Sequence, residues 1–457
     1  MTHTARQPRR ISPCTAVRLT GSDRELLLRL LALRTAGPLE TGGAEPVELW
    51  EAQSAYARAA GELGFRVVHH APAGPDALTG SDVPRSVRQA AGATPGFLDC
   101  QPNMVLRLGP ELPRAATVMF NVHLDTVAGG GPVSFNGSRF HGRGSIDAKG
   151  PAVGLLAGLR AALAASPALG TEVGVLIQLV SGEEGGAMGV FGTKPLVEQG
   201  YMGRLNVFCE PTGLRVLSRA TASMTARLRV DGRDGIDDEP GAGHNATVLL
   251  GYLAQHLATE LPPYAVDGQV CVAGLNTGSM HNKVYGTGQL LINLSYGSQD
   301  TGRKLEAALD DVLRTGVERF RERFADSPTF ATTARDAAHV THLDWLKRGL
   351  PALYADDAWV SGLLLDRAGL APWPAELPAF TCDAIWLAGV PDTSTVVFGP
   401  GDLGANQAHA EGEFADLADL DRYARHIGRL LISFARDRLD QDADPDPDQD
   451  QDQDQGN

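Results

Sequence analysis

The chain has 457 residues, of which 43% are hydrophobic, and a formal net charge of −15. This length exceeds what one hydrophobic core usually serves, so two domains are expected. The acidic balance argues against nucleic acid as a partner, and the lack of any run of about 18 apolar residues argues against a membrane-spanning helix.

Both ends of the chain are expected to lie outside the folded body. Residues 1–21 are basic and lack the apolar segment of a secretory signal, so they are predicted to be a flexible N-terminus. Eight aspartates and no basic residue follow from Asp440 onward, so 437–457 is predicted to be a disordered acidic tail. The five cysteines form no CxxC pair, which favours a reducing cytoplasm over a disulfide framework or a thiolate metal site.

The first part of the body, residues 22–214, reads as an α/β catalytic domain. Apolar residues recur at helical spacing over 23–35, 47–64 and 151–165, and apolar strands are predicted at 66–70, 116–127, 172–180 and 204–209. Strand, helix and strand in this order indicate a parallel sheet, in which sites gather at the carboxyl ends of the strands.

The pattern changes over residues 215–327, which we interpret as an inserted α+β domain. Strands are predicted at 220–232 and 289–297, and helices at 245–261 and 302–324. The α/β pattern resumes over 328–436, the second part of the catalytic domain, with a strand at 394–398 and a helix at 419–439.

Two motifs in the first part hold candidate metal-binding side chains. His123 and Asp125 lie two residues apart on a predicted strand, so both side chains face the same way. A carboxylate in that position can orient a metal-bound imidazole, although taken alone the pair is better explained by a histidine satisfied within its strand. Asp147, in the glycine-flanked stretch GRGSIDAKG, precedes a predicted helix, where a carboxylate can bind a cation or simply cap the helix.

Acidic and imidazole groups recur after the later strands. Glu183 and Glu184 are adjacent, and such a pair needs a cation or a shared proton unless it lies in a solvated turn. Glu210 follows the next strand, and His409 lies in a glycine-rich loop. Together these groups suit two divalent cations, with zinc favoured and cobalt or manganese as alternatives.

Five short motifs resemble those of the M20 metallopeptidases and occur in the same order. They are HLDTV, GRGSIDAKG, SGEEGG, EPTG and GPGD with AHAEGEF. That family includes aminoacylases, acetylornithine and succinyl-diaminopimelate deacylases, and glutamate carboxypeptidases. The resemblance spans about residues 22–435. It implies a split α/β catalytic domain, with a mixed, mainly parallel sheet flanked by helices, and an inserted α+β lid that often mediates dimerisation.

The resemblance also implies roles for individual residues. It implies that His123 and Glu210 bind one metal ion, that Glu184 and His409 bind the other, and that Asp147 bridges the two. Glu183 matches the general base, and Asp125 matches the carboxylate behind the first histidine. Glu413 stands where the family has a glutamate after the last ligand.

The inserted domain departs from the family pattern. Ile236 stands where the family usually has a histidine that stabilises the oxyanion, often donated by the partner subunit. Ser295 stands where an arginine commonly binds a substrate carboxylate. Asn282 matches a lid asparagine of similar purpose. His244 and His281 are candidates to replace the missing donor, and the alternative is that they are an ordinary helix-start histidine and an ordinary loop histidine.

The expected function is that of a di-metal amidohydrolase that cleaves an N-acyl or peptide bond of an amino-acid-like small molecule. Glu183 is expected to take a proton from water and return it to the departing amine. A homodimer formed through the inserted domain is a further expectation. Two alternatives remain open at this point, a metal-dependent enzyme that forms amides or transfers acyl groups, and a non-hydrolytic binding protein with a rewritten lid.

Overall fold

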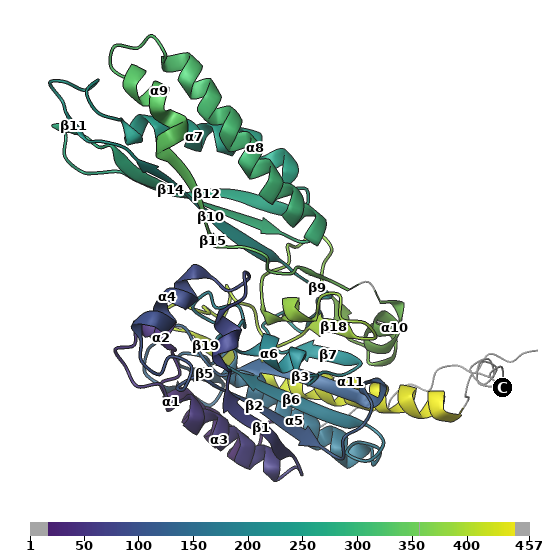
Figure 1. The fold of residues 1–457 in the computed structure, drawn as a ribbon. Helices are drawn as coiled ribbons and strands as arrows, with labels where there is room; N and C mark the ends of the chain where they lie inside the picture. The colour runs from purple at the N-terminus through teal and green to yellow at the C-terminus, as the bar shows by residue number, and fades with distance from the viewer. Residues whose placement is uncertain (1–16, 356, 444–457) are drawn as a thin grey trace, which may run out of the picture.

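The structure, a computed structural model, describes residues 17–355 and 357–443, which form two units (Figure 1). The core unit contains residues 17–220 and 348–443, and the inserted unit contains residues 221–347. Figure 1 shows the inserted unit extending away from one side of the core unit.

A six-stranded sheet forms the centre of the core unit. Only β2 runs against the direction of the other strands, which confirms the mixed, mainly parallel sheet expected from the sequence. In spatial order the strands are β1 (Arg66–Pro72), β2 (Pro102–Leu108), β6 (Gly174–Val180), β3 (Thr117–His123), β7 (Leu205–Phe208) and β18 (Ser394–Val397). Strands β3, β6 and β7 are buried throughout, as their apolar sequences predict.

Four helices pack together on one face of this sheet: α1 (Gly21–Ala32), α3 (Leu49–Gly61), α5 (Lys149–Ala165) and α11 (Leu417–Ala443). Helix α5 is buried over most of its length because it packs against the sheet, α1 and α11. A Cβ at Gly158 would come within 2.7 Å of the Ala424 carbonyl oxygen on α11, so glycine permits this close approach. The packing of α5 fixes the loop that precedes it.

Shorter elements cover the other face and the edges of the sheet. Among them, α6 and η5 contact one another, and each contacts a strand of the sheet. The short helices are α2 (Pro38–Thr41), η1 (Pro75–Leu78), α4 (Arg85–Ala93), η2 (Arg114–Ala116), α6 (Thr193–Glu198), α10 (Ala358–Ser361), η4 (Gly362–Arg367) and η5 (Asp383–Leu387). The short strands are β4 (Ser134–Phe135), β5 (Arg139–His141) and β19 (Phe414–Asp416) in one sheet, β8 (Arg215–Val216) with β17 (Ala371–Pro372), and β9 (Arg219–Ala220) with β16 (Leu353–Tyr354).

The inserted unit is an antiparallel sheet with helices on one face. Its strands, in spatial order, are β12 (Gly268–Asn276), β14 (Thr287–Tyr296), β10 (Ala222–Asp231) and β15 (Thr341–Lys347). The helices are α7 (Ala246–Glu260), η3 (Pro262–Tyr264), α8 (Gln299–Phe324) and α9 (Ala331–Val340), and β11 (Gly235–Ile236) pairs with β13 (Lys283–Val284). Strand β10 shows the cause of this arrangement, because alternate residues from Met224 to Val230 are buried beneath the helices.

The inserted unit ends about twenty residues later than the sequence analysis placed its boundary, at 327. Strand β15 follows α9 and pairs with β10, with Leu343 opposite Leu228. Helix α8, which the sequence predicts to be the last element of the insertion, is followed by α9 and β15. Pairing with a strand more than a hundred residues away decides where β15 belongs, and local sequence pattern does not show such pairing.

Part of each end that the sequence predicts to be flexible or disordered is folded. Leu19 is buried and its backbone nitrogen donates to Asp421 Oδ1 at 2.8 Å, so part of the segment 1–21 is folded. Helix α11 continues to Ala443, and Asp437 contacts Trp359 Nε1 at 2.8 Å and Arg367 at 2.6 Å. Residues 1–16 and 444–457, on which the rest of both predictions falls, lie outside the described residues. No helix in the described ranges is long and apolar enough to span a bilayer.

Candidate functional site

The predicted site residues gather at the carboxyl ends of three neighbouring strands. His123 is the last residue of β3, Glu183 and Glu184 follow β6, and Glu210 follows β7. The three strands are parallel and adjacent, in the order β6–β3–β7. Their carboxyl ends therefore meet at one edge of the sheet, where ligand sites form in this class of fold.

A first group of side chains consists of His123, Asp147 and Glu210. Asp147 enters from the loop before α5, and His123 Nε2 lies 2.8 Å from Asp147 Oδ1 and 3.7 Å from Glu210 Oε1. All three residues are buried, and their candidate ligand atoms lie within 4.8 Å of one another. One cation could therefore contact all three side chains.

A second group consists of Asp147, Glu184 and His409, the last from the loop between β18 and β19. His409 Nε2 lies 3.1 Å from Asp147 Oδ2 and 3.0 Å from Glu184 Oε1. The two carboxylates raise the pKa of His409 to about 10, so a proton and a metal ion would compete for this ring. Asp147 belongs to both groups, with Oδ1 toward His123 and Oδ2 toward His409.

The charges and contacts of these groups fit two divalent cations. Among the described residues, Asp147, Glu184 and Glu210 form ion pairs only with His123 and His409. Glu184 Oε1 is buried and accepts no hydrogen bond, although His409 Nε2 is 3.0 Å away. This arrangement suits ligand atoms that face a common cation. Burial raises the pKa of Glu184 to about 7 and also raises that of Glu210, because a buried carboxylate loses the solvation of its charge.

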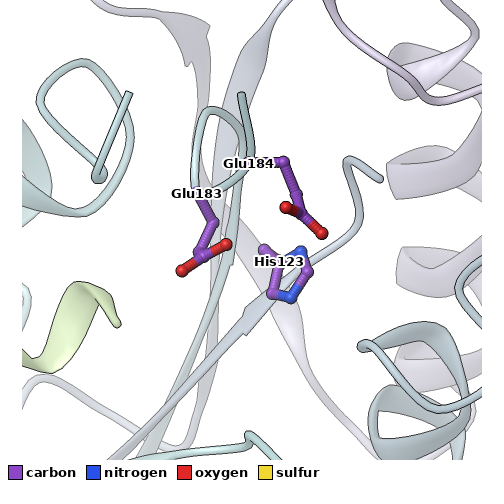
Figure 2. A group of neighbouring side chains, drawn as sticks. All are labelled: His123, Glu183 and Glu184. Atoms are coloured by element: carbon purple, nitrogen blue, oxygen red, sulfur yellow. The ribbon is translucent and has the colours of Figure 1, made fainter. Parts of the chain in front are cut away.

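Glu183 lies beside both groups. Figure 2 shows the carboxylates of Glu183 and Glu184 and the ring of His123 directed into the same space, and their candidate ligand atoms lie within 4.8 Å of one another. Burial, supported by the nearby charge of Glu210, raises the pKa of Glu183 well above its usual range. A carboxylate with a raised pKa beside a ligand set is suited to accept and return a proton near neutral pH.

Asp125 supports the cluster from behind, partly in a way that the sequence did not indicate. Its Oδ2 accepts hydrogen bonds from the backbone nitrogens of Gly182 at 3.0 Å and Glu184 at 3.1 Å, which fixes the loop carrying the two glutamates. His123 Nδ1 lies 2.9 Å from the Asp125 carbonyl oxygen but 3.8 Å from Oδ1 of its carboxylate. A ring that donates from Nδ1 to a carbonyl keeps Nε2 available as a ligand.

Glu413 holds the loop that carries Asp147. Its Oε1 accepts hydrogen bonds from the backbone nitrogens of Ile146 at 3.0 Å and Asp147 at 3.3 Å. Its Oε2 lies 2.6 Å from Arg143. Glu413 and Arg143 thus join two segments 270 residues apart in the chain, which places Asp147 between the two histidines.

Asp383, at the start of η5, is a buried acid near the cluster that the sequence analysis missed. Its Oδ2 accepts a hydrogen bond from Thr193 Oγ1 at 2.6 Å. Burial raises the pKa of Asp383 to about 8, and the charge of Asp383 contributes to the raised pKa of Glu183. The surrounding sequence, FTCDAIW, has no apolar strand directly before the acid, so the signal that marked the other residues is absent.

The candidate substrate-binding residues of the inserted unit do not join the cluster. Asn282 and His281 are exposed beside β13, which pairs with β11. Figure 1 shows β11 at the end of the inserted unit farthest from the core unit. His244 Nδ1 accepts from the Arg233 backbone nitrogen at 2.8 Å, and its Nε2 lies 3.2 Å from Asp336 Oδ2, so both ring nitrogens are used within the inserted unit. The substrate-binding roles of these three residues stay predictions.

Comparison with known protein families identifies the family of this chain. Residues 119–433 match Peptidase family M20/M25/M40. This match covers more than half of the chain and includes every residue of both groups. The chain belongs to the M20 peptidase family.

Two relatives align with part of this M20 chain. A putative LysW-lysine/LysW-ornithine hydrolase from Aeropyrum pernix is 33% identical over 204 residues, which cover 44% of the chain and 53% of that protein. Succinyl-diaminopimelate desuccinylase from Gluconobacter oxydans is 29% identical over 234 residues, which cover 47% of the chain and 59% of that protein. The alignments thus span little more than half the length of each relative.

Solved structures resemble the whole fold. An M20 family metallo-carboxypeptidase from Sulfolobus solfataricus superposes with a TM-score of 0.65 at 12% identity, covering 91% of this chain and 100% of that one. A tripeptidase from Staphylococcus aureus gives 0.64 at 14% identity, covering 91% and 98%. Human carnosine dipeptidase 1 gives 0.60 at 14% identity, covering 91% and 97%. These similarities confirm the fold of the M20 chain.

Proposed function

We propose that this M20 protein is a di-metal amidohydrolase that cleaves an N-acyl or peptide bond of an amino-acid-like substrate. One observation carries the proposal above all others: Asp147 directs one carboxylate oxygen toward each of two ligand groups, and Glu183 stands beside them. A buried acid shared between two groups could contribute a ligand atom to a cation in each of them.

The proposed ligands divide into two sets that share Asp147. His123 and Glu210 would hold one ion, and Glu184 and His409 the other. Imidazole and carboxylate ligands without thiolates favour zinc, and they also accept cobalt or manganese. When bound, the two ions would supply Lewis acidity to the scissile carbonyl and to the attacking water.

Side chains of the protein transfer the proton and hold the metal-binding loops in place. Glu183 accepts the proton that water loses on attack and delivers it to the nitrogen of the departing amine, so that the C–N bond breaks without expelling a charged amide. Asp125 keeps Glu183 and Glu184 in place through the backbone of their loop. Glu413 does the same for Asp147.

The substrate class is inferred from relatives and from chemistry. The names of the aligned relatives describe hydrolysis of a lysine or ornithine linked to LysW and removal of a succinyl group from diaminopimelate. Both names describe the removal of an attached group from an amino acid. We therefore infer that an acylated amino acid or a short peptide is the substrate of this chain.

A panel experiment tests this proposal. Protein loaded with zinc, cobalt or manganese is incubated with N-acyl amino acids, dipeptides and N-carbamoyl amino acids, and released amines are quantified. We expect hydrolysis of at least one member, which chelation abolishes and added metal restores. Hydrolysis that resists chelation, or a panel without any product, would contradict the proposal. A parallel incubation of amines with acyl donors detects amide formation, and its success without hydrolysis would favour the amide-forming alternative.

Compartment and assembly are part of the same proposal. Among the described residues, Cys100, Cys209, Cys271 and Cys382 are free thiols, which supports a reducing compartment such as the cytoplasm. Strand β12 lies at the edge of the inserted sheet, with one side paired to β14. An edge strand is a surface on which a second copy can pair, which supports a homodimer formed through the inserted unit.

A further inference from the structure

The inserted sheet has one face that its helices leave uncovered. On β10 the residues that pack under α7, α8 and α9 alternate with Ser223, which is also buried, and with the half-buried Thr225, Arg227 and Arg229. We call the face carrying these four residues the open face. Figure 1 shows the helices on the side of the sheet away from the core unit. The open face is therefore the side of the inserted unit from which groups can approach a substrate bound in the core unit.

Lys347 differs from the other cations near this face. Arg227 and Arg229 both pair with Asp344 on β15, at 2.7 and 3.2 Å. Lys347 Nζ donates to Ser223 Oγ at 2.7 Å, and no carboxylate of the described residues pairs with it. An ammonium group has three N–H donors, so two protons of this half-buried side chain have no protein acceptor in the described structure. Burial also lowers the pKa of Lys347.

Contacts between the two units place the Lys347 end of β15 beside the core unit. Strand β15, which ends at Lys347, contacts α4 of the core unit. Two residues before Ser223, the Thr221 backbone nitrogen donates to the Phe380 carbonyl at 3.0 Å, and Thr221 Oγ1 lies 2.9 Å from Thr381 Oγ1. Two residues of strand span about 7 Å. The Lys347 ammonium group is thus near the segment that leads directly into Asp383, the buried acid beside Glu183.

The residue opposite Ser223 on the neighbouring strand is also small. Ser223 pairs directly with Ser295 on β14, so two small side chains adjoin on the open face. Ser295 stands where the family commonly has an arginine that binds a substrate carboxylate. Lys347 reaches the same part of the sheet from β15, on the other side of β10.

We propose that Lys347 is the residue that binds a carboxylate group of the substrate. This inference rests on the proposed function, because it assigns a second anchor to the substrate of the same site. A carboxylate beside the Lys347 ammonium group would accept hydrogen bonds from the two N–H groups that have no acceptor among the described residues. It would also neutralise the charge of this half-buried side chain. The inserted unit would thereby select substrates with a free carboxylate, and a carboxamide in the same place would bind less well.

Ligand binding tests this without requiring turnover. The probes are N-acetyl derivatives of the twenty common L-amino acids and their matching C-terminal amides, and dissociation constants for the metal-loaded protein are measured by ligand-observed NMR. Wild type is expected to bind at least one acid about 10–100-fold more tightly than its amide, the range typical of one hydrogen bond to a charged group. In K347M that preference should fall below about threefold.

Two further variants make the result specific. K304M removes an exposed lysine that pairs with Asp300 on α8, and it should keep the wild-type preference. K347Q serves if K347M does not give a wild-type melting curve. The proposal is overturned if no acid is preferred to its amide by wild type, or if folded Lys347 variants keep the preference. A Lys347-dependent preference for acids over amides, found without any hydrolysis, would support this inference and contradict the proposed activity. Hydrolysis without a preference for acids would support the proposed activity and contradict this inference.

Discussion

Replacing Glu183 with glutamine is expected to lower kcat/KM by about 10²–10⁴-fold, the usual contribution of a general acid–base group. Glutamine has nearly the same shape but cannot take a proton from water. Glu183 also lies outside the two groups that share Asp147, so the variant should bind as much metal as wild type. Steady-state kinetics on the best substrate, with metal content measured by mass spectrometry on the same sample, gives both quantities.

The position of Glu183 makes the metal measurement informative. Glu183 forms its own group with His123 and Glu184, so a role as metal ligand is a direct competitor of the general-base role. Loss of an ion from Glu183→Gln would favour the ligand role and contradict the assignment of the base. Glu172→Gln is a matched control, because Glu172 is exposed near the opposite end of the same strand, β6, and its loss should leave both activity and metal content unchanged.

Replacing Asp147 with asparagine is expected to have the larger effect. The variant removes the negative charge that both groups share, so both ions should bind more weakly. Lewis-acid stabilisation is worth several kcal/mol, and each 1.36 kcal/mol corresponds to about tenfold in rate, so activity should fall by at least about 10³-fold. Metal content should drop toward zero after dialysis against a dilute chelator.

Glu210→Gln provides the comparison for Asp147. Glu210 belongs to one group only, so its variant should keep one ion under the same dialysis and lose the other. Loss of the same number of metal ions from Asp147→Asn and Glu210→Gln would mean that Asp147 is not shared between the two groups. Retention of both ions and of wild-type activity in Asp147→Asn would contradict the shared-ligand arrangement altogether.

Sequence alone could predict most of the cluster because most of its members adjoin a recognisable strand or helix. His123, Glu184 and Glu210 come directly after apolar strands, and parallel neighbours bring such ends together. Asp147 precedes an apolar run that had to be a buried helix. His409 had no such support from local pattern, and only the order of the family motifs indicated its place.

The remaining features depend on contacts between distant segments. Asp383 is buried beside the cluster through packing of η5 on α6, which no local pattern shows. Strand β15 belongs to the inserted sheet because it pairs with β10, and α11 continues past residue 436 because Asp437 meets Trp359 and Arg367. The open position of Lys347 is likewise visible only once its strand is known to lie beside Ser223.

Anomalous diffraction from crystals grown with zinc tests the central claim most directly. We expect two peaks joined by Asp147, one in contact with His123 and Glu210 and the other in contact with Glu184 and His409. A single ion that does not touch Asp147, or peaks only at sites outside these five side chains, would contradict a paired metal centre in this protein.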